Sequence, residues 1–154
     1  MIFLWFTFLM ASYEFISYNK TDYKLVIDPN DNIKLGTVND HQKTHLQSHF
    51  HFKESKPGEV VIMSVEDNPK MMNFDKNTLS MSNDAQQWTV SLSSNGSFRI
   101  SRGEYCITVA SELEVEMSTC SNKDSELFIL RNLISGDVLK SYGGPVYSFK
   151  SELE

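Results

Sequence analysis

The four histidines of this 154-residue sequence crowd into one short stretch: His41, His45, His49 and His51. A spacing of four would place His41 and His45 on one face of a helix. His49 and His51, two apart, would share one face of a strand. Imidazole nitrogens bind Zn²⁺ and Cu²⁺, so these side chains form a candidate metal site. The alternative is a solvated loop and an outward strand face that hold no metal.

Cys106 and Cys120 are the only two cysteines. No C-x-x-C motif is present and the nearest histidine is remote in sequence, so thiol redox chemistry and a cysteine-based zinc site both lack their partners. Whether the two thiols pair therefore depends on the compartment that the protein occupies.

The start of the chain indicates that compartment. Residues 1–11 are almost all apolar and carry no charged side chain. This run is too short to cross a bilayer, and the small residues Ala11 and Ser12 end it as at a signal-peptidase site. We predict a secretory signal over residues 1–12, with a buried N-terminal strand as the alternative. Secretion would allow Cys106 and Cys120 to form a disulfide.

Catalytic motifs are missing from the sequence. It contains no G-x-S-x-G, H-E-x-x-H, Walker or G-x-G-x-x-G pattern, so we predict neither an enzyme nor a cofactor. Glu112, Glu114 and Glu116 alternate with apolar residues, which predicts a strand with a uniform outward acidic face. A glycosidase would instead need two carboxyl groups in different environments.

Composition limits the class of protein and its partners. The chain has 14 Lys+Arg against 20 Asp+Glu, a net charge of −6, and no run of basic residues. A nucleic-acid partner or an anionic membrane surface is therefore not expected, because both need clustered cations. An apolar fraction of 40% with 22% charged residues is enough for one folded domain.

Short strands separated by turn-forming stretches fill the rest of the chain. Runs such as 23–27, 60–62 and 88–90 are rich in β-forming residues, and stretches such as 28–32 and 93–96 are rich in Asp, Asn, Pro, Ser and Gly. Residues 40–48 are the one stretch that could be helical. The sequence predicts an all-β fold.

Three segments can be laid over one another, which indicates an internal repeat. They are residues 23–26, 69–72 and 105–108. Each is followed at equal spacings by a pair of apolar residues with the period of a strand. These pairs are Ile33 and Leu35, Leu79 and Met81, and Val115 and Met117. With the flanking strands, twelve strands result, and we predict a β-trefoil of three four-strand repeats over residues 13–130.

Gln86-Gln87-Trp88 resembles the Q-x-W signature of the ricin B-type β-trefoil lectins, and Cys106 and Cys120 sit like the disulfide within one repeat of that family. The segments 48–50 and 126–128 occupy the corresponding places in degenerate form. The resemblance implies that Gln86 holds a turn by hydrogen bonds and that Trp88 fills the core. The chain also resembles ricin-B-like secreted proteins of microsporidian parasites.

Sugar binding is what the resemblance implies, but the usual residues are replaced. In the family an Asp follows the first cysteine place by two residues, an aromatic ring lies near the second, and an Asn precedes Q-x-W. Those places hold Thr108, Ser118 and Ala85, and the Asp place falls on Val26 in the first repeat and Met72 in the second. Asp28, Thr108 and Gln86 are the candidate carbohydrate-binding residues.

These observations predict a secreted, non-catalytic recognition module, extracellular or associated with the cell wall. Its expected partners are glycans, a glycoprotein surface, or wall or coat proteins, with no membrane span after signal cleavage. A structural wall or coat protein and a trefoil protease inhibitor that uses the loop 36–48 are the alternatives. Residues 131–154 are apolar enough to form a C-terminal extension packed on the domain.

Overall fold

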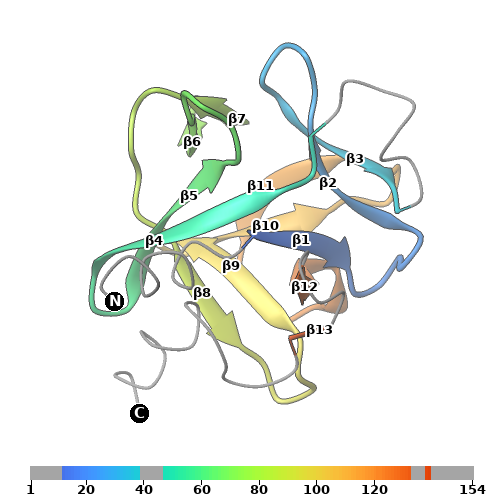
Figure 1. Ribbon diagram of the computed structural model, residues 1–154. Coiled ribbons are helices and arrows are strands. Elements are labelled where there is room, and N and C mark those ends of the chain that lie inside the picture. Colours follow the sequence, from blue (N-terminus) through green and yellow to red (C-terminus); the bar gives the residue numbers. More distant parts are fainter. Residues whose placement is uncertain (1–11, 39–46, 133–137, 140–154) are drawn as a thin grey trace.

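The computed structural model describes residues 12–38, 47–132 and 138–139. These residues form strands and one short 3-10 helix (Figure 1). The elements are β1 (Ser12–Ser17), β2 (Tyr23–Ile27), β3 (Ile33–Thr37), β4 (Phe50–Lys56), β5 (Glu59–Ser64), β6 (Met71–Asp75), β7 (Thr78–Ser82), β8 (Thr89–Leu92), β9 (Phe98–Arg102), β10 (Tyr105–Val109), β11 (Val115–Thr119), η1 (Asp124–Glu126), β12 (Leu127–Asn132) and β13 (Val138–Leu139). None of the described segments is a helix long and apolar enough to cross a membrane.

Six strands close into a barrel in the order β1, β4, β5, β8, β9 and β12, each antiparallel to the next. β12 then pairs with β1 along its length, which brings the two ends of the domain together (Figure 1). The link between β5 and β8 is a bridge from Val60 to Trp88. Closure leaves these six strands without a free edge, which removes a route to edge-to-edge aggregation.

Three hairpins, β2–β3, β6–β7 and β10–β11, complete the fold. Their second strands β3, β7 and β11 contact one another, so the hairpins gather around a common axis. Each repeat thus supplies two barrel strands and one hairpin. The predicted β-trefoil is confirmed, and its three-fold arrangement follows from equivalent apolar residues in each repeat.

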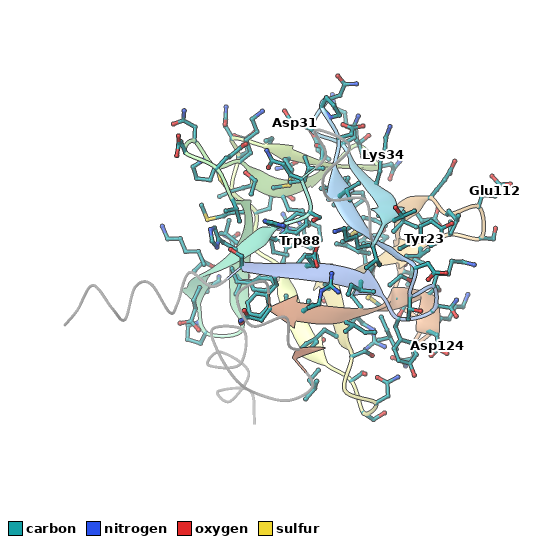
Figure 2. All side chains as sticks on the ribbon, turned by 45° about the vertical axis from the view of Figure 1, so that its right-hand side comes forward. Tyr23, Asp31, Lys34, Trp88, Glu112 and Asp124 are labelled. Carbon is teal, nitrogen blue, oxygen red and sulfur yellow. A yellow bond between two sulfur atoms is a disulfide. The ribbon has the colours of Figure 1, made fainter. Side chains whose placement is uncertain are left out.

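The core shows this equivalence directly. Three sets of residues at equivalent places in the repeats are all fully buried. They are Phe50, Trp88 and Phe128, which lie at the start of β4, just before β8 and near the start of β12; Phe15, Ile62 and Ile100 on β1, β5 and β9; and Leu25, Met72 and Ile107 in the hairpins. Figure 2 shows Trp88 in the interior of the molecule. Apolar burial of this extent is the main favourable term in folding.

In the second repeat the structure shifts the predicted alignment of the three repeats by one residue. Leu25 lies opposite Leu35 and Ile107 opposite Met117, but in the second hairpin Met72, not Met71, lies opposite Met81. The reason is the length of the turn. Five-residue turns join the two strands of the first hairpin (residues 28–32) and of the third hairpin (residues 110–114). The second hairpin has a turn of only two residues, 76–77. Both of these turn residues have positive φ, as tight hairpin turns require.

A buried ion cluster lies at the closing seam of the barrel, and we call Glu14, Lys24, Ser48 and Arg131 the seam cluster. Glu14 is 2% exposed and Lys24 is 0% exposed. Lys24 Nζ donates to Glu14 Oε2 at 2.5 Å, Ser48 Oγ donates to the same oxygen at 3.1 Å, and Arg131 Nε donates to Oε1 at 2.9 Å. The cluster therefore ties β1 to β2, to the segment that precedes β4, and to β12.

The charges of this cluster set the ionisation of Glu14. Burial by itself raises the pKa of this carboxyl, but hydrogen bonds and charge from Lys24 and Arg131 outweigh burial and lower the pKa. Glu14 is therefore an anion at neutral pH, paired with two cations.

The first and twelfth strands extend slightly beyond the predicted domain boundaries at residues 13 and 130. β1 begins at Ser12, while the predicted signal lies almost wholly outside the described residues. β12 continues through Asn132, past the predicted boundary at 130, and the short strand β13 pairs with it. The rest of the predicted extension, residues 133–137 and 140–154, lies outside the described part of the chain.

Candidate functional site

Gln86 and Trp88 both serve the fold. Gln86 Oε1 accepts the backbone N–H of Phe74 at 2.8 Å, and its Nε2 donates to the Phe74 carbonyl at 3.3 Å. Trp88 is 0% exposed and its indole N–H donates to the carbonyl of Met72 at 3.1 Å. Both ends of the Gln86 amide are thus engaged by backbone, as the resemblance implied, and Trp88 offers no ring to a ligand.

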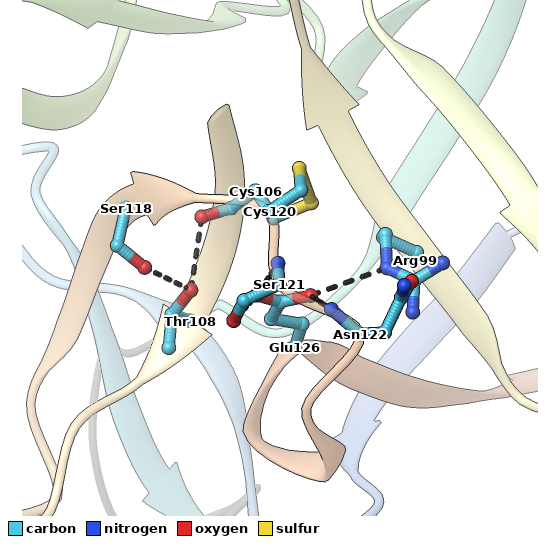
Figure 3. The surroundings of a disulfide bond; sticks show 8 residues. All are labelled: Arg99, Cys106, Thr108, Ser118, Cys120, Ser121, Asn122 and Glu126. Carbon is cyan, nitrogen blue, oxygen red and sulfur yellow. Dashed lines mark hydrogen bonds and ion pairs between the residues drawn. A yellow bond between two sulfur atoms is a disulfide. The ribbon is translucent and has the colours of Figure 1, made fainter. Parts of the chain in front are cut away.

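Glu126 takes the place of the Gln in the third repeat and is 1% exposed. Its Oε2 accepts from the backbone N–H and the hydroxyl of Ser121 at 2.7 and 2.9 Å. Its Oε1 accepts from the N–H of Asn122 at 3.1 Å and from Arg99 Nε at 3.3 Å (Figure 3). Burial raises the pKa of this carboxyl, but the Ser121 hydrogen bonds and the Arg99 charge outweigh it and lower the pKa.

A disulfide joins Cys106 of β10 to Cys120 just after β11. The two residues are 14 positions apart in sequence, and their Cα atoms are 5.1 Å apart. The carbonyl of Cys106 accepts the Thr108 hydroxyl at 3.0 Å, and the hydroxyls of Thr108 and Ser118 are 2.8 Å apart (Figure 3). The disulfide therefore anchors the strand that carries Thr108 to the connection that leads to Glu126.

An open pocket of about 740 Å³ lies beside this disulfide, and we call it the third-repeat pocket. Its walls come from β10, β11, the connection through η1, and the loop between β1 and β2. Hydroxyl side chains line much of it: Thr108, Ser111, Ser118, Thr119, Ser121 and Ser125. Charged side chains complete the lining: Lys20, Glu116, Lys123 and Glu126. This lining is suited to a polar ligand that carries several hydroxyl groups.

The three candidate carbohydrate-binding residues are not brought together, because each belongs to a different repeat. Thr108 lines the third-repeat pocket and Gln86 does not. Asp28 Oδ1 accepts the backbone N–H groups of Asn30 and Asn32 at 2.8 and 2.9 Å, and Oδ2 pairs with Lys34 at 2.9 Å. The Asn32 hydrogen bond is the main cause that lowers the pKa of Asp28. Asp28 thus holds the β2–β3 turn.

Asp28 also lines a second pocket, of about 130 Å³, between the first and second repeats. Carboxylates dominate the charge of its described lining, since Asp31 and Glu66 line it as well and Lys70 is the single basic side chain among these residues. Lys70 Nζ is paired with Asp31 at 2.5 Å, and Glu66 accepts from Gln47 and Ser64. Its polar groups are therefore largely satisfied by one another.

The place predicted for the family's Asp in the second repeat changes with the corrected alignment. Asn73, not Met72, is equivalent to Thr108, because Met72 points into the core with 0% exposure. Asn73 is 8% exposed and its amide donates to the carbonyl of Asp84 at 3.3 Å. The repeat thus holds an amide at this place, already engaged by backbone.

The predicted acidic strand is also corrected. β11 begins at Val115, so Glu112 and Glu114 lie in the turn 110–114 and only Glu116 lies on the strand. Leu113 has a φ of 62° in this turn and does not belong to an inward strand face. Figure 2 shows Glu112 at the end of a projecting loop. Glu116 alone of these carboxylates lines the third-repeat pocket.

The histidine site remains a prediction. His41 and His45 lie outside the described residues. His49 is exposed just before β4, and His51 is half-buried on β4 with its Nδ1 3.4 Å from Ser12 Oγ. Within ranges 12–38, 47–132 and 138–139, no three His, Cys, Asp or Glu side chains are grouped so as to hold a metal.

Sequence reasoning missed the basic residues of the third-repeat pocket. Lys20 comes from the loop between β1 and β2, and Lys123 precedes η1. No motif joins these positions, because only barrel closure brings the first loop against the third repeat.

The barrel of six strands with three hairpins defines the chain as a β-trefoil, and known structures agree. Cry35Ab1 matches with a TM-score of 0.70 and 16% identity, over 81% of this chain and 36% of that one. ThreeFoil, a designed three-fold symmetric protein, matches with a TM-score of 0.65 and 10% identity, over 79% and 99%. A Polyporus squamosus lectin, bound to the human-type influenza-binding epitope Neu5Aca2-6Galb1-4GlcNAc, matches with a TM-score of 0.64 and 13% identity, over 80% and 49%.

Sequence comparison then gives the family. Residues 7–133 match the family described as the ECU07_1090 N-terminal domain, and the chain belongs to that family. No curated protein matches the sequence. At identities of 10–16% the structural matches show the fold alone, and this chain spans about a third of Cry35Ab1 and half of the lectin.

Proposed function

We propose that this protein is a secreted, non-catalytic recognition module of the ricin B type that binds carbohydrate in the third-repeat pocket. The observation that carries the proposal is the lining of that pocket, with six hydroxyl side chains beside a disulfide anchor. Pockets for drug-like molecules are mostly apolar, whereas a saccharide needs hydrogen-bonding groups for its hydroxyls. The ligand would be a free glycan or the glycan of a wall, coat or other surface protein.

A binding role, not catalysis, is favoured by the state of the two carboxylates in the pocket. Glu126 accepts four hydrogen bonds, and its lowered pKa keeps it ionised at neutral pH. Glu116 is exposed on β11. Hydrolysis of a glycosidic bond needs one carboxyl whose pKa is raised so that it can donate a proton. Glu126, whose pKa is lowered, does not meet that need.

Secretion is supported by two independent features. A disulfide persists in oxidising compartments and is rare in the cytosol. The apolar first eleven residues precede a small-residue site that suits cleavage. A glycan partner is further supported by the Polyporus squamosus lectin, a trefoil relative in fold that is bound to a saccharide. The similarity to microsporidian secreted proteins is part of the same proposal.

A glycan array probed with the full chain tests this function, with Glu116→Ala as the pocket variant and Glu112→Ala as its control. Both side chains are exposed acids, but only Glu116 lines the pocket. We expect the Glu116 variant to lose at least about tenfold in affinity, because a carboxylate that accepts ligand hydroxyls is lost. The control should bind as the wild type does. Absence of glycan binding by the wild type would refute the function.

A further inference from the structure

Lys20 and Lys123 are two cations in the lining of the third-repeat pocket that form no ion pair among the described residues. Lys20 is half-buried in the loop after β1, and Lys123 is exposed ahead of η1. On a chain with a net charge of −6, two cations without partners at one pocket are a local excess of positive charge.

The carboxylates of the same pocket do not cancel that excess. Glu126 is engaged by Arg99 and by backbone N–H groups, so its charge is already balanced. Among the described residues of the lining, Glu116 is then the one uncommitted anion against two lysines. Once Glu126 is balanced by Arg99, the remaining charge of the described lining is net positive.

The lining also lacks the ring on which a neutral sugar stacks. No aromatic side chain is among the described residues that line the third-repeat pocket, and Ser118 holds the place near the second cysteine. The apolar C–H face of a hexose gains attraction from an aromatic platform. Without it, binding has to come from hydrogen bonds and from charge.

The second pocket provides an internal contrast. It is lined by Asp28, Asp31 and Glu66, and its lysine is already paired with Asp31. An anion would be repelled there and attracted at the third-repeat pocket, although both lie between neighbouring repeats of the same fold.

We infer that the third-repeat pocket takes an acidic saccharide, with the carboxylate or sulfate of the sugar between Lys20 and Lys123. The hydroxyls of the same sugar bond to Thr108, Ser118 and Glu116, which line the pocket from β10 and β11. This inference rests on the proposed function and adds the class of ligand. It requires a preference for charged over neutral sugars of the same stereochemistry.

Calorimetric titration of the full chain with matched sugars tests the inference. The acidic probe is trigalacturonate, and its control is the carboxyl-reduced trisaccharide, in which a neutral CH₂OH group replaces each carboxylate and the stereochemistry is kept. A 6-sulfated galactose oligosaccharide and its unsulfated form make a second pair and distinguish sulfate from carboxylate. Each titration is run at about 0.05 M and about 0.5 M salt, because screening weakens exposed charge pairs.

The variants are Lys20→Gln with Lys123→Gln, and Lys53→Gln as the control, an exposed lysine of β4 outside the pocket lining. We expect the acidic probe to bind about tenfold more tightly than its neutral form at low salt, and the double variant to abolish this preference. The control should keep it. Retained binding of the neutral form would show that the double variant is folded.

The outcomes separate the inference from the function on which it rests. Equal affinity for acidic and neutral sugars, or a preference that survives in the double variant, would overturn the inference and leave carbohydrate binding intact. Failure of all four sugars and of the glycan array would overturn both.

Discussion

Replacing Glu14 by Gln should destabilise the protein strongly, because it removes the anion of the seam cluster while keeping the shape of the side chain. Lys24 has a fully buried side chain, and its ammonium lies 2.5 Å from Glu14 Oε2. Arg131 bonds to the other carboxylate oxygen. The variant would leave the buried side chain of Lys24 without a counter-charge.

The expected loss is about 3–5 kcal/mol of unfolding free energy at neutral pH, the usual cost of leaving a buried ion without its partner. Because a domain of this size is stable by only about 5–15 kcal/mol, this is a large fraction of its stability. The double variant Glu14→Met with Lys24→Met should recover much of the loss, since it removes both charges together.

Urea denaturation measures these changes, with Glu54→Gln on the exposed face of β4 as the control. The pH dependence gives a second readout. The pKa of Glu14 is lowered on folding, so its contribution is complete above the unfolded pKa of about 4.3 and is lost as pH falls through the folded value. The difference between wild type and Glu14→Gln should therefore shrink in acid.

Two results would refute this reasoning about the seam cluster. One is a Glu14→Gln variant within about 0.5 kcal/mol of the wild type at neutral pH, the range of ordinary surface changes. The other is a difference that stays constant between neutral pH and about pH 3, which would mean that ionisation of Glu14 is not its cause.

Three further predictions concern the core, the disulfide and the C-terminus. Trp88→Ala should lower the unfolding free energy by about 3–5 kcal/mol, and equal melting temperatures of variant and wild type would contradict its core role. Cys106→Ser with Cys120→Ser should cost about 3 kcal/mol and weaken glycan binding in the adjacent pocket; an unchanged affinity would show that the disulfide does not shape the pocket. Truncation after Leu130 should be less stable in urea than truncation after Asn132 by about 2 kcal/mol, since only the shorter chain loses the guanidinium of the seam cluster; equal midpoints would count against this.

The repeats and much of the core could be predicted from sequence because their signal is local. Alternating apolar residues define strands, and the resemblance of Gln86-Gln87-Trp88 to the Q-x-W signature implies a turn anchor and a packed ring. The one-residue error in the second repeat arose at a turn. Spacing alone does not reveal that Lys76 and Asn77 both adopt positive φ and close the hairpin tightly.

The candidate site was less predictable, because hydrogen bonding decides which polar groups remain available. Asp28 has the right chemistry to bind sugar hydroxyls, yet the β2–β3 turn and Lys34 already use its oxygens. The hydroxyl of Thr108 also has partners, the carbonyl of Cys106 and the hydroxyl of Ser118, but Thr108 lines an open pocket. The sequence shows which side chains are polar and not which of them are already satisfied.

The sequence by itself determined the class of fold, the three-fold recurrence of apolar positions and the pair of cysteines, since all depend on short-range pattern. Only the tertiary structure decided the partners of its charges. From its residue type Lys24 would be expected on the surface, but in the folded barrel it is buried against Glu14. Arg131, 117 positions away from Glu14 in sequence, bonds to the same carboxylate. Barrel closure also places Lys20 beside the third repeat, where it lines the third-repeat pocket. Electrostatic attraction depends on distance in space, and barrel closure sets that distance for residues far apart in sequence.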